Sequence, residues 1–100
     1  MSGDARRLDQ WLWFARFFKS RAAASRFCLA GKMRVNLIPT AKPHHPVRPG
    51  DVLTFMAPGG RLRVVRVLVL GHRRGPAAEA RGLYEDLGPS RAVAHKYTTG

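Results

Sequence analysis

Apolar residues between positions 8 and 18 recur at the spacing of one helical face, and this feature constrains the fold more than any other. A helix over 8–18 gathers them on one broad stripe, while Asp9 and Arg16 fall away from it. The stripe consists of Leu8, Trp11, Leu12, Phe14, Ala15 and Phe18. We therefore expect the stripe to enter a core, with Asp9 in the first turn, where its charge meets the positive end of the helix dipole.

The residues that follow predict a second helix. Ser20 suits the N-cap position, because its hydroxyl can accept a hydrogen bond from a free backbone N–H group at a helix start. Gly31 is placed to close this helix in a left-handed conformation. Its inner side would carry Ala23, Ala24, Phe27 and Cys28, and the alanines let the two helices approach closely. Residues 34–36 then indicate a short strand that enters a loop.

The later part of the chain has the pattern of strands. A turn at 48–51 releases a strand over 52–56, and a Pro-Gly-Gly turn at 58–60 leads into another strand. The alternation of that strand shifts phase at Val64 and Val65. This shift predicts either a bulge there or cover on both faces of the sheet.

Positive charge dominates the composition. The chain has 18 Lys and Arg against 6 Asp and Glu, a formal net charge of +12, which predicts a polyanionic partner, with nucleic acid first. No apolar run approaches the roughly 18 residues that span a membrane, so no membrane association is expected. The single Cys28 cannot form an intramolecular disulfide and is expected to be buried, which favours a cytoplasmic protein.

Several short motifs occur in order along the first half of the chain. They are RLDxWLxxxRFFKSRxxAxxF from Arg7, GKxRVN from Gly31, Lys42-Pro43, and RPGDVL from Arg48. Together they resemble the S4 RNA-binding domain over residues 7–55. The segments 75–80 and 83–85 extend the resemblance to the small, ribosome-associated heat-shock branch of that family in bacteria. One departure is visible, because residues 37–41 stand where the family has a glycine and a shorter connection to Lys-Pro.

The resemblance implies an α+β, S4-like fold in which two packed N-terminal helices lie against a small, mostly antiparallel sheet, followed by a C-terminal helix. We expect a mobile N-terminus over 1–6, the S4-like module over 7–55, and an extension over 56–88 that packs on the same domain. Residues 89–100 are expected to form a disordered tail. The protein is expected to be a monomer.

The C-terminal helix is expected to begin at Pro76 and to stop at Gly88-Pro89. Its apolar side would carry Ala80, Leu83, Tyr84 and Leu87. Trp13 and Phe17 lie four residues apart on the first helix, opposite its main stripe. They could stack on RNA bases or receive another element of the protein, and the C-terminal helix is the candidate to cover them.

No set of residues in the sequence suggests catalysis. The six acidic residues fall at a terminus, at helix starts, in a turn or on a helix surface, so no paired-carboxylate site is indicated. The four histidines have no cysteine or acid at metal-ligand spacing, so no metal site is expected. We find no cofactor motif and therefore expect a protein that is not an enzyme.

Basic side chains near the expected second helix are the candidates for RNA binding. Lys and Arg reach phosphate oxygens, and the free N–H groups at the helix start add a further anion site, so the run 19–21 combines both. The predicted RNA-binding residues are Arg7, Arg16, Lys19, Ser20, Arg21, Arg26, Lys32, Arg34, Lys42 and Arg48.

The expected function is therefore non-catalytic binding of structured RNA. The resemblance implies that this RNA is ribosomal RNA and that the large subunit is the partner. The resemblance to the heat-shock branch implies a role in stress response, helping to recycle stalled large subunits that carry peptidyl-tRNA. Two alternatives remain open at this point. One is a general nucleic-acid binder or chaperone for RNA and DNA, and the other is an adaptor that targets an enzyme to RNA.

Overall fold

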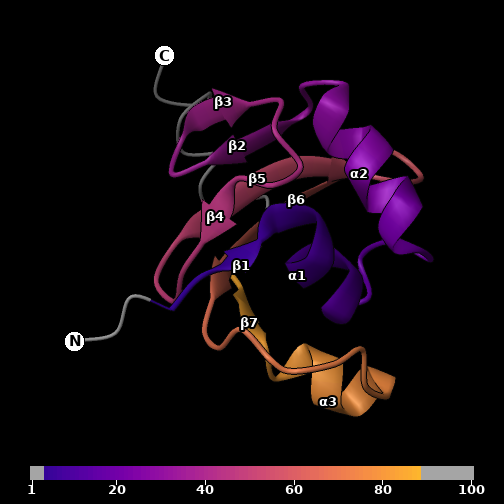
Figure 1. Cartoon of the computed structure of the whole chain (residues 1–100), viewed down its shortest axis with the longest axis vertical. Helices are drawn as coiled ribbons and strands as arrows, with labels where there is room; N and C mark the ends of the chain where they lie inside the picture. Colours follow the sequence, from indigo (N-terminus) through magenta and orange to yellow (C-terminus); the bar gives the residue numbers. More distant parts are fainter. Residues whose placement is uncertain (1–3, 89–100) are drawn as a thin grey trace.

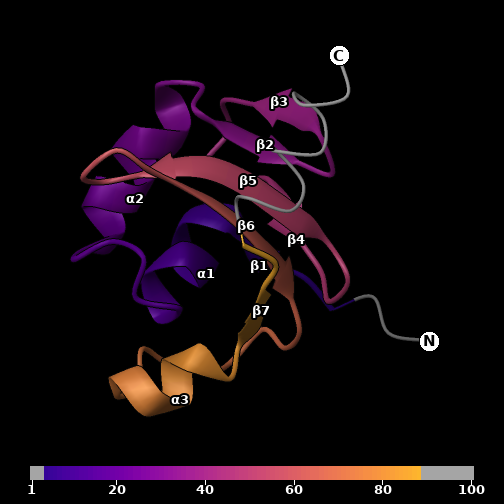
Figure 2. The ribbon, with the colours of Figure 1, turned by 180° about the vertical axis from the view of Figure 1, so that it is seen from behind.

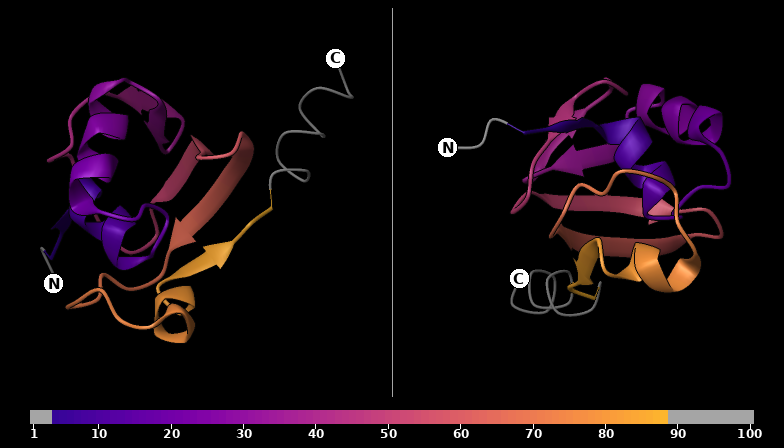
Figure 3. Two further views of the ribbon diagram at one scale, coloured as in Figure 1. Left: turned by 90° about the vertical axis from the view of Figure 1, so that its right-hand side faces the viewer. Right: turned by 60° about the horizontal axis from the view of Figure 1, so that its bottom comes forward.

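The computed structural model describes residues 4–88. The elements are β1 (Arg6–Arg7), α1 (Leu8–Phe14), α2 (Arg21–Leu29), β2 (Met33–Val35), β3 (Ile38–Thr40), β4 (Pro46–Val47), β5 (Val52–Ala57), β6 (Arg61–Val67), α3 (Ala77–Arg81) and β7 (Tyr84–Asp86). An antiparallel five-stranded sheet in the order β3-β2-β5-β6-β7 forms one layer of this part of the chain. Helices α1 and α2 cover one face of it, as the left view of Figure 3 shows. This arrangement confirms the S4-like α+β fold class (Figure 1).

Helix α1 is shorter than the sequence predicts, because it ends at Phe14 rather than continuing to Phe18. Arg16 has a left-handed φ of 66°, and its N–H donates to the Trp13 carbonyl at 3.0 Å. The N–H of Phe17 donates to the Leu12 carbonyl at 3.1 Å. These two bonds form a Schellman motif, which terminates a helix. The position usually holds glycine, so an arginine there gave no sequence signal for the end of the helix.

Helix α2 follows the prediction closely. The Ser20 hydroxyl accepts a hydrogen bond from the Ala23 N–H at 3.0 Å, which confirms Ser20 as the N-cap. Gly31 closes the helix with a φ of 75°, and its N–H donates to the Cys28 carbonyl at 2.9 Å. Cys28 is fully buried, as expected. Burial raises the pKa of its thiol to about 12, and the negative charge of Asp9 adds to that effect.

The core lies between the two helices and one face of the sheet. The predicted stripe of α1 and the turn after it is buried throughout, and Phe18 remains part of the core although it lies beyond the helix. The strands contribute Met33, Val35, Leu53, Phe55, Val65 and Val67 to the same core. The Trp11 indole N–H donates to the Val69 carbonyl at 3.0 Å, so this large side chain is buried without an unpaired polar atom.

Strands β5 and β6 pair without a bulge from Val52↔Arg66 to Ala57↔Arg61. Val64 and Val65 therefore point to opposite faces of the sheet, and both are buried. Of the two alternatives for the phase shift in this strand, cover on both faces is thus confirmed. Strands β2 and β3 form a hairpin through a two-residue turn, in which Asn36 and Leu37 have φ values of 53° and 71°. The sequence predicted only a loop in place of β3.

The prediction of a helix from Pro76 to Leu87 is wrong beyond Arg81. Helix α3 covers only Ala77–Arg81, and the following residues form β7, which pairs with β6. The physical reason is that the outer edge of β6 would otherwise carry unpaired backbone N–H and C=O groups. Pairing with β7 gives these groups hydrogen-bond partners, which a helix at this position would not. Strand β7 and α3 lie at the opposite end of the molecule from the β2–β3 hairpin (Figures 1 and 2).

The expected mobile N-terminus over 1–6 differs from the structure at Arg6. Strand β1 pairs with β4 through Arg6↔Val47 and Arg7↔Pro46. The Arg6 guanidinium also donates to the Gly71 carbonyl at 2.8 Å and lies over the Phe14 ring. Residues 1–3 and the expected tail at 89–100 lie outside the described residues.

Candidate nucleic-acid interface

The start of α1 is closed by a segment far along the chain. The Leu8 N–H donates to the His45 carbonyl at 2.9 Å, and the Asp9 N–H donates to the Pro43 carbonyl at 3.0 Å. Free N–H groups at a helix start need such acceptors when they are buried. The Lys42-Pro43 motif therefore has a structural role, because it fixes the position of α1 and with it the side chains of Arg7 and Asp9.

Asp9 is buried, with 1% of its surface exposed, contrary to the expectation that it falls away from the core. Its two carboxylate oxygens accept hydrogen bonds from the Arg7 guanidinium at 3.0 and 2.9 Å. The Arg21 Nε lies 3.9 Å from Asp9 Oδ2. A buried carboxylate needs such partners, because burial of an unpaired charge is unfavourable. The hydrogen bonds and charge of Asp9 raise the pKa of the Arg7 guanidinium.

Asp9 thus brings the start of α1 and the start of α2 together. Arg7 and Arg21 are anchored on it, while 48% and 41% of their side-chain surfaces remain exposed. Lys19 is exposed and precedes the N-cap Ser20 directly. We name Arg7, Lys19, Ser20 and Arg21 the α2-head cluster. It combines three cations with the positive end of a helix dipole, which is an arrangement suited to phosphate oxygens.

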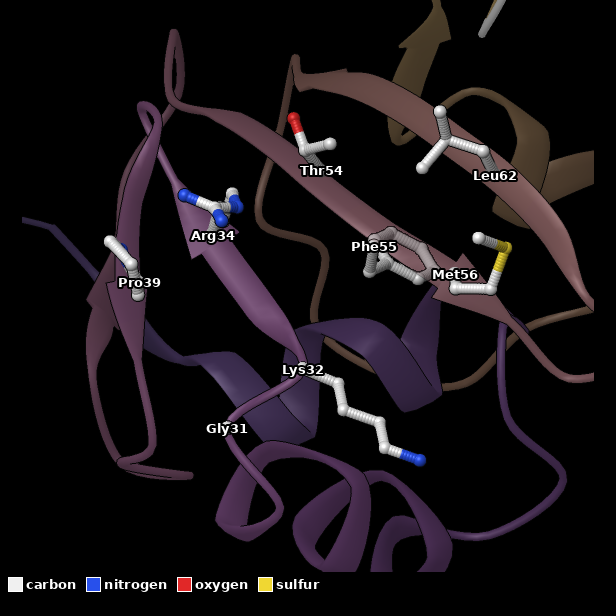
Figure 4. A pocket seen from close by; sticks show the side chains of 8 residues that line it. All are labelled: Gly31, Lys32, Arg34, Pro39, Thr54, Phe55, Met56 and Leu62. Atoms are coloured by element: carbon white, nitrogen blue, oxygen red, sulfur yellow. The ribbon is translucent and has the colours of Figure 1, made fainter.

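The other predicted residues are spread over the surface. Arg26 is exposed on α2, and Arg34 is exposed on the face of β2 that points away from the helices. Lys32 and Arg34 line an open hollow of about 270 Å³ beside Thr54, Met56 and Leu62 (Figure 4). In Figure 4 the Lys32 side chain extends along the rim of this hollow, below Met56.

Lys42 and Arg48 line a second hollow of about 540 Å³ between β3 and β4. The polar motif residues next to it hold the backbone. The Asn36 side chain accepts a hydrogen bond from the Val52 N–H at 2.9 Å and donates to the Asp51 carboxylate at 3.1 Å. The Arg48 N–H donates to the other Asp51 oxygen at 2.9 Å. Asn36 and Asp51 therefore hold together the β2–β3 turn and the turn at 48–51, from which Arg48 extends.

Arg16 takes a different direction from the α2-head cluster. Its Nε donates to the Gly75 carbonyl at 2.7 Å, so the side chain turns toward the C-terminal part of the chain. The structure thus brings four of the ten predicted residues together at the head of α2 and leaves the others on separate surfaces. Their contacts with RNA remain predictions.

Trp13 and Phe17 pack within the protein. The Phe17 ring lies 4.7 Å from the Tyr84 ring and 5.3 Å from the Phe55 ring, measured between centroids. The Arg74 guanidinium lies over the Trp13 ring at 5.7 Å. These contacts favour the packing alternative over base stacking. The cover comes from β7 and the loop before α3, not from a long C-terminal helix.

Three further arginines, Arg61, Arg63 and Arg74, were not among the predicted residues, although they lie beside Phe17 and Trp13. Arg61 and Arg63 alternate along β6, so their side chains share one face of the sheet. This alternation could have shown that the two arginines lie on one face of the sheet. It could not show which face, because that depends on the position of Phe17 in the fold. Arg74 had no local signal, because its contacts with Trp13 and the Phe18 carbonyl join residues far apart in sequence.

Within residues 4–88, no three His, Cys, Asp or Glu side chains come together in a way that could hold a metal ion. None of the helices in the same residues is long and apolar enough to cross a membrane.

Comparison with known proteins supplies relatives for this arrangement. The S4 domain family matches residues 6–53. Heat shock protein 15 of Escherichia coli K12 is 40% identical over 84 residues, which cover 84% of this chain and 62% of the relative. The Heat shock protein 15 homolog of Haemophilus influenzae is 35% identical over 80 residues, which cover 80% and 60%. The chain therefore spans about 60% of the length of these curated relatives.

A solved structure extends the similarity to the whole fold. The trimeric structure of Vibrio cholerae Heat Shock Protein 15 superimposes with a TM-score of 0.80 at 30% identity. The match covers 96% of this chain and 95% of that chain. The similarity therefore includes the C-terminal elements as well as the part matched by the S4 domain.

Proposed function

The chain belongs to the Heat shock protein 15 family and contains an S4 domain, and from this premise we propose that it is a non-catalytic protein that binds structured RNA. The observation that carries the proposal is the buried Asp9, which accepts two hydrogen bonds from Arg7 and forms an ion pair with Arg21 at the head of α2. Guanidiniums that are already oriented lose less side-chain entropy when they bind phosphate.

The surface suits the RNA backbone better than it suits base edges. The α2-head cluster offers cations and a helix start, which bind phosphate groups without reading sequence. Its aromatic neighbours Trp13 and Phe17 are engaged in packing and are not free for base stacking. A folded RNA with closely spaced phosphates is therefore the expected ligand, and the net charge of +12 supports long-range attraction to it.

The finer assignment is to ribosomal RNA of the large subunit. The resemblance to the ribosome-associated heat-shock branch supports a role in which the cytoplasmic protein binds a stalled large subunit that still carries peptidyl-tRNA and helps to recycle it. The names of the relatives support a role in heat stress. This assignment rests on the resemblance and not on the geometry of the α2-head cluster, because the cluster can bind phosphate groups of any structured RNA.

The first experiment is cosedimentation of the purified protein with small subunits, large subunits, and large subunits that carry peptidyl-tRNA, at two salt concentrations. Selective binding to the loaded large subunit supports the finer assignment. Equal, salt-sensitive binding to all three, and to random RNA and DNA duplexes, would instead identify a general nucleic-acid binder.

A substitution series tests the site itself. Replacing Lys19, Arg21 and Arg26 together by Ala should weaken RNA binding and lower the slope of log K against log salt by about one unit for each phosphate that the variant no longer neutralises. Arg81→Ala, on exposed α3, is the control and should leave the slope unchanged. Normal circular dichroism with an unchanged slope in the triple variant would reject both the α2-head cluster and Arg26 as RNA contacts.

A further inference from the structure

A second basic surface lies near the N-terminal end of the link between α1 and α2, residues 15–20, whereas the α2-head cluster lies at its C-terminal end. It is a hollow of about 440 Å³ between Arg16 and Phe17 on that link and the β5–β6 turn at 57–60, with Arg61 and Arg63 at its wall. We name it the linker hollow. In Figures 1 and 2, the link and the β5–β6 turn lie on the same side of the molecule.

Arg63 forms a fixed wall of the linker hollow. Its guanidinium lies over the Phe17 ring at 5.0 Å from the centroid, and 19% of its side-chain surface is exposed. One of its nitrogens donates to an Asp86 oxygen at 3.2 Å. Stacking on an aromatic ring holds a guanidinium in one plane and leaves its edge nitrogens available to an acceptor.

Arg16 and Arg61 supply the linker hollow with further positive charge. Arg16 is held by its left-handed backbone and by the bond from its Nε to the Gly75 carbonyl at 2.7 Å. Arg61 is exposed at the start of β6, on the same face of the strand as Arg63. Within residues 4–88, neither Arg16 nor Arg61 forms an ion pair with a carboxylate.

The turn beside these arginines leaves room for a ligand. Gly59 and Gly60 have φ values of 94° and 84°, a conformation that glycine adopts without strain, and neither carries a side chain over the hollow. The site thus has three guanidiniums, of which only that of Arg63 contacts a carboxylate, the exposed Asp86, and it is open on one side. Guanidiniums match the geometry of phosphate oxygens through pairs of parallel N–H donors.

We propose that the linker hollow is a second phosphate site, which holds a different phosphate group of the same RNA that the α2-head cluster binds. This inference rests on the proposed function. The link carries Lys19 and Ser20 of the α2-head cluster at one end and Arg16 of the hollow at the other, so one short segment joins the two sites. The RNA backbone must then pass along the link between α1 and α2.

The test compares two single charge removals on exposed arginines. The probe is an RNA hairpin with a stem of about 16 base pairs, long enough to reach both sites. Arg61→Gln should lower the slope of log K against log salt by about one unit, and should do so again in a Lys19→Gln, Arg21→Gln background. Arg81→Gln removes the same charge outside the hollow and should leave the slope unchanged.

A local measurement accompanies the binding data. The side-chain Nε–Hε signals of Arg16 and Arg61 in the folded, isotope-labelled protein should shift when the RNA hairpin is added. The same signals are then followed with a poly-glutamate peptide. Shifts with the peptide but not with the RNA would overturn the proposal and identify the occupant as an acidic protein segment.

The outcomes separate this inference from the proposed function. If Arg61→Gln keeps the wild-type slope while the Lys19 and Arg21 substitutions lower it, the linker hollow is not a phosphate site and RNA binding at the head of α2 stands. If the wild-type protein fails to bind the hairpin and ribosomal subunits at low salt, both are rejected.

Discussion

The two halves of the described chain are held together by different interactions. Over residues 6–53, hydrogen bonds from polar motif residues close the structure, as at Ser20 and at the Asn36–Asp51 pair. Over residues 54–88, aromatic rings and stacked guanidiniums, as at Tyr84 and Arg74, add to the hydrogen bonds that join this part to the first half. The first kind depends on donors and acceptors in defined positions, whereas the second tolerates changes in geometry and is spread over larger surfaces.

This difference has a consequence for the basic surface. In the first half the cations of the α2-head cluster are oriented by a buried acid, Asp9. In the second half Arg63 is oriented by a ring, Phe17, and its acidic partner Asp86 is exposed. A single substitution in the first arrangement should therefore lower the free energy of unfolding by a large amount, whereas a single substitution in the second should lower it only slightly.

Trp11 is a fully buried residue of the first half that contacts the second half, so its loss should have the largest effect. Its ring faces Tyr84 edge-on at 6.4 Å and its indole donates to the Val69 carbonyl. Trp11→Ala should lower the free energy of unfolding by about 3–5 kcal/mol, as for other large core truncations. Trp11→Phe keeps an aromatic ring and removes the hydrogen bond, so urea unfolding should show a markedly smaller decrease. Equal decreases in the two variants would contradict the role given to the ring.

Asp9→Asn and Asp86→Asn compare the two acidic partners directly. Asp9→Asn should lower the free energy of unfolding by about 2–3 kcal/mol, because Arg7 and Arg21 lose a buried charged acceptor. Asp86→Asn removes an exposed partner of Arg63 and should change it by less than about 1 kcal/mol. Urea titrations of both variants measure the difference. Similar values for the two would remove the distinction between the two halves.

The burial of Cys28 in the first half should make the free energy of unfolding depend on pH. Its pKa is raised from 9.0 to about 12 in the folded protein, so the unfolded chain releases the thiol proton first as the pH rises. Stability from this group is fully present below pH 9.0 and should fall by up to about 1.4 kcal/mol per pH unit between 9.0 and 12. Cys28→Ala lacks this titrating group, so its stability should fall less steeply over the same window in parallel denaturant titrations.

Ser20 tests the polar closure at a single hydrogen bond. Ser20→Ala removes the acceptor for the Ala23 N–H and should lower the free energy of unfolding by about 1 kcal/mol. Ser25→Ala lies within the same helix and is the matched control, because alanine favours the helix interior. Thermal unfolding followed by circular dichroism should therefore move in opposite directions for the two variants.

Leu37 should give the smallest effect, and it should be a gain. Its φ of 71° is unfavourable for leucine, and Leu37→Gly should raise the free energy of unfolding by about 0.5 kcal/mol, after the larger entropy of the unfolded glycine is subtracted. Ile38→Gly at the next position, within β3, should lower it by about 0.5–1 kcal/mol. A decrease of stability in Leu37→Gly would show that its exposed side chain contributes packing.

The same contrast explains which features could be predicted from the sequence. The S4-like fold class, the buried stripe of α1, the Ser20 cap and the Gly31 helix end were predicted correctly, because each depends on local spacing or on one residue type. The end of α1 at Phe14 was not predictable, because the left-handed position that follows it is occupied by Arg16, whose side chain donates a hydrogen bond to the Gly75 carbonyl. Strand β7 was missed because Tyr84 and the flanking Leu83 and Leu87 also fit one side of a helix, and only pairing with the edge of β6 decides between the two structures.

The candidate site shows the same division. Residues 19–21 were recognised as a cluster because they are consecutive and begin a helix. The role of Asp9 was missed, because Arg21 and the Pro43 carbonyl, which contact this residue in the structure, lie far from it in the sequence. Arg61 and Arg63 could be assigned to the linker hollow only after Phe17 was placed beneath Arg63.

The closure of α1 by the carbonyls of Pro43 and His45 also sets an order for folding during synthesis. A helix of seven residues is too short to persist alone in water, and its first N–H groups have no acceptors until residues 43–47 are available. A nascent chain of which only the residues of α1 and α2 have emerged from the ribosome therefore cannot hold Asp9, Arg7 and Arg21 together. The α2-head cluster would assemble only after about half of this chain has left the ribosomal exit tunnel, so a shorter nascent fragment carries the charges without the site.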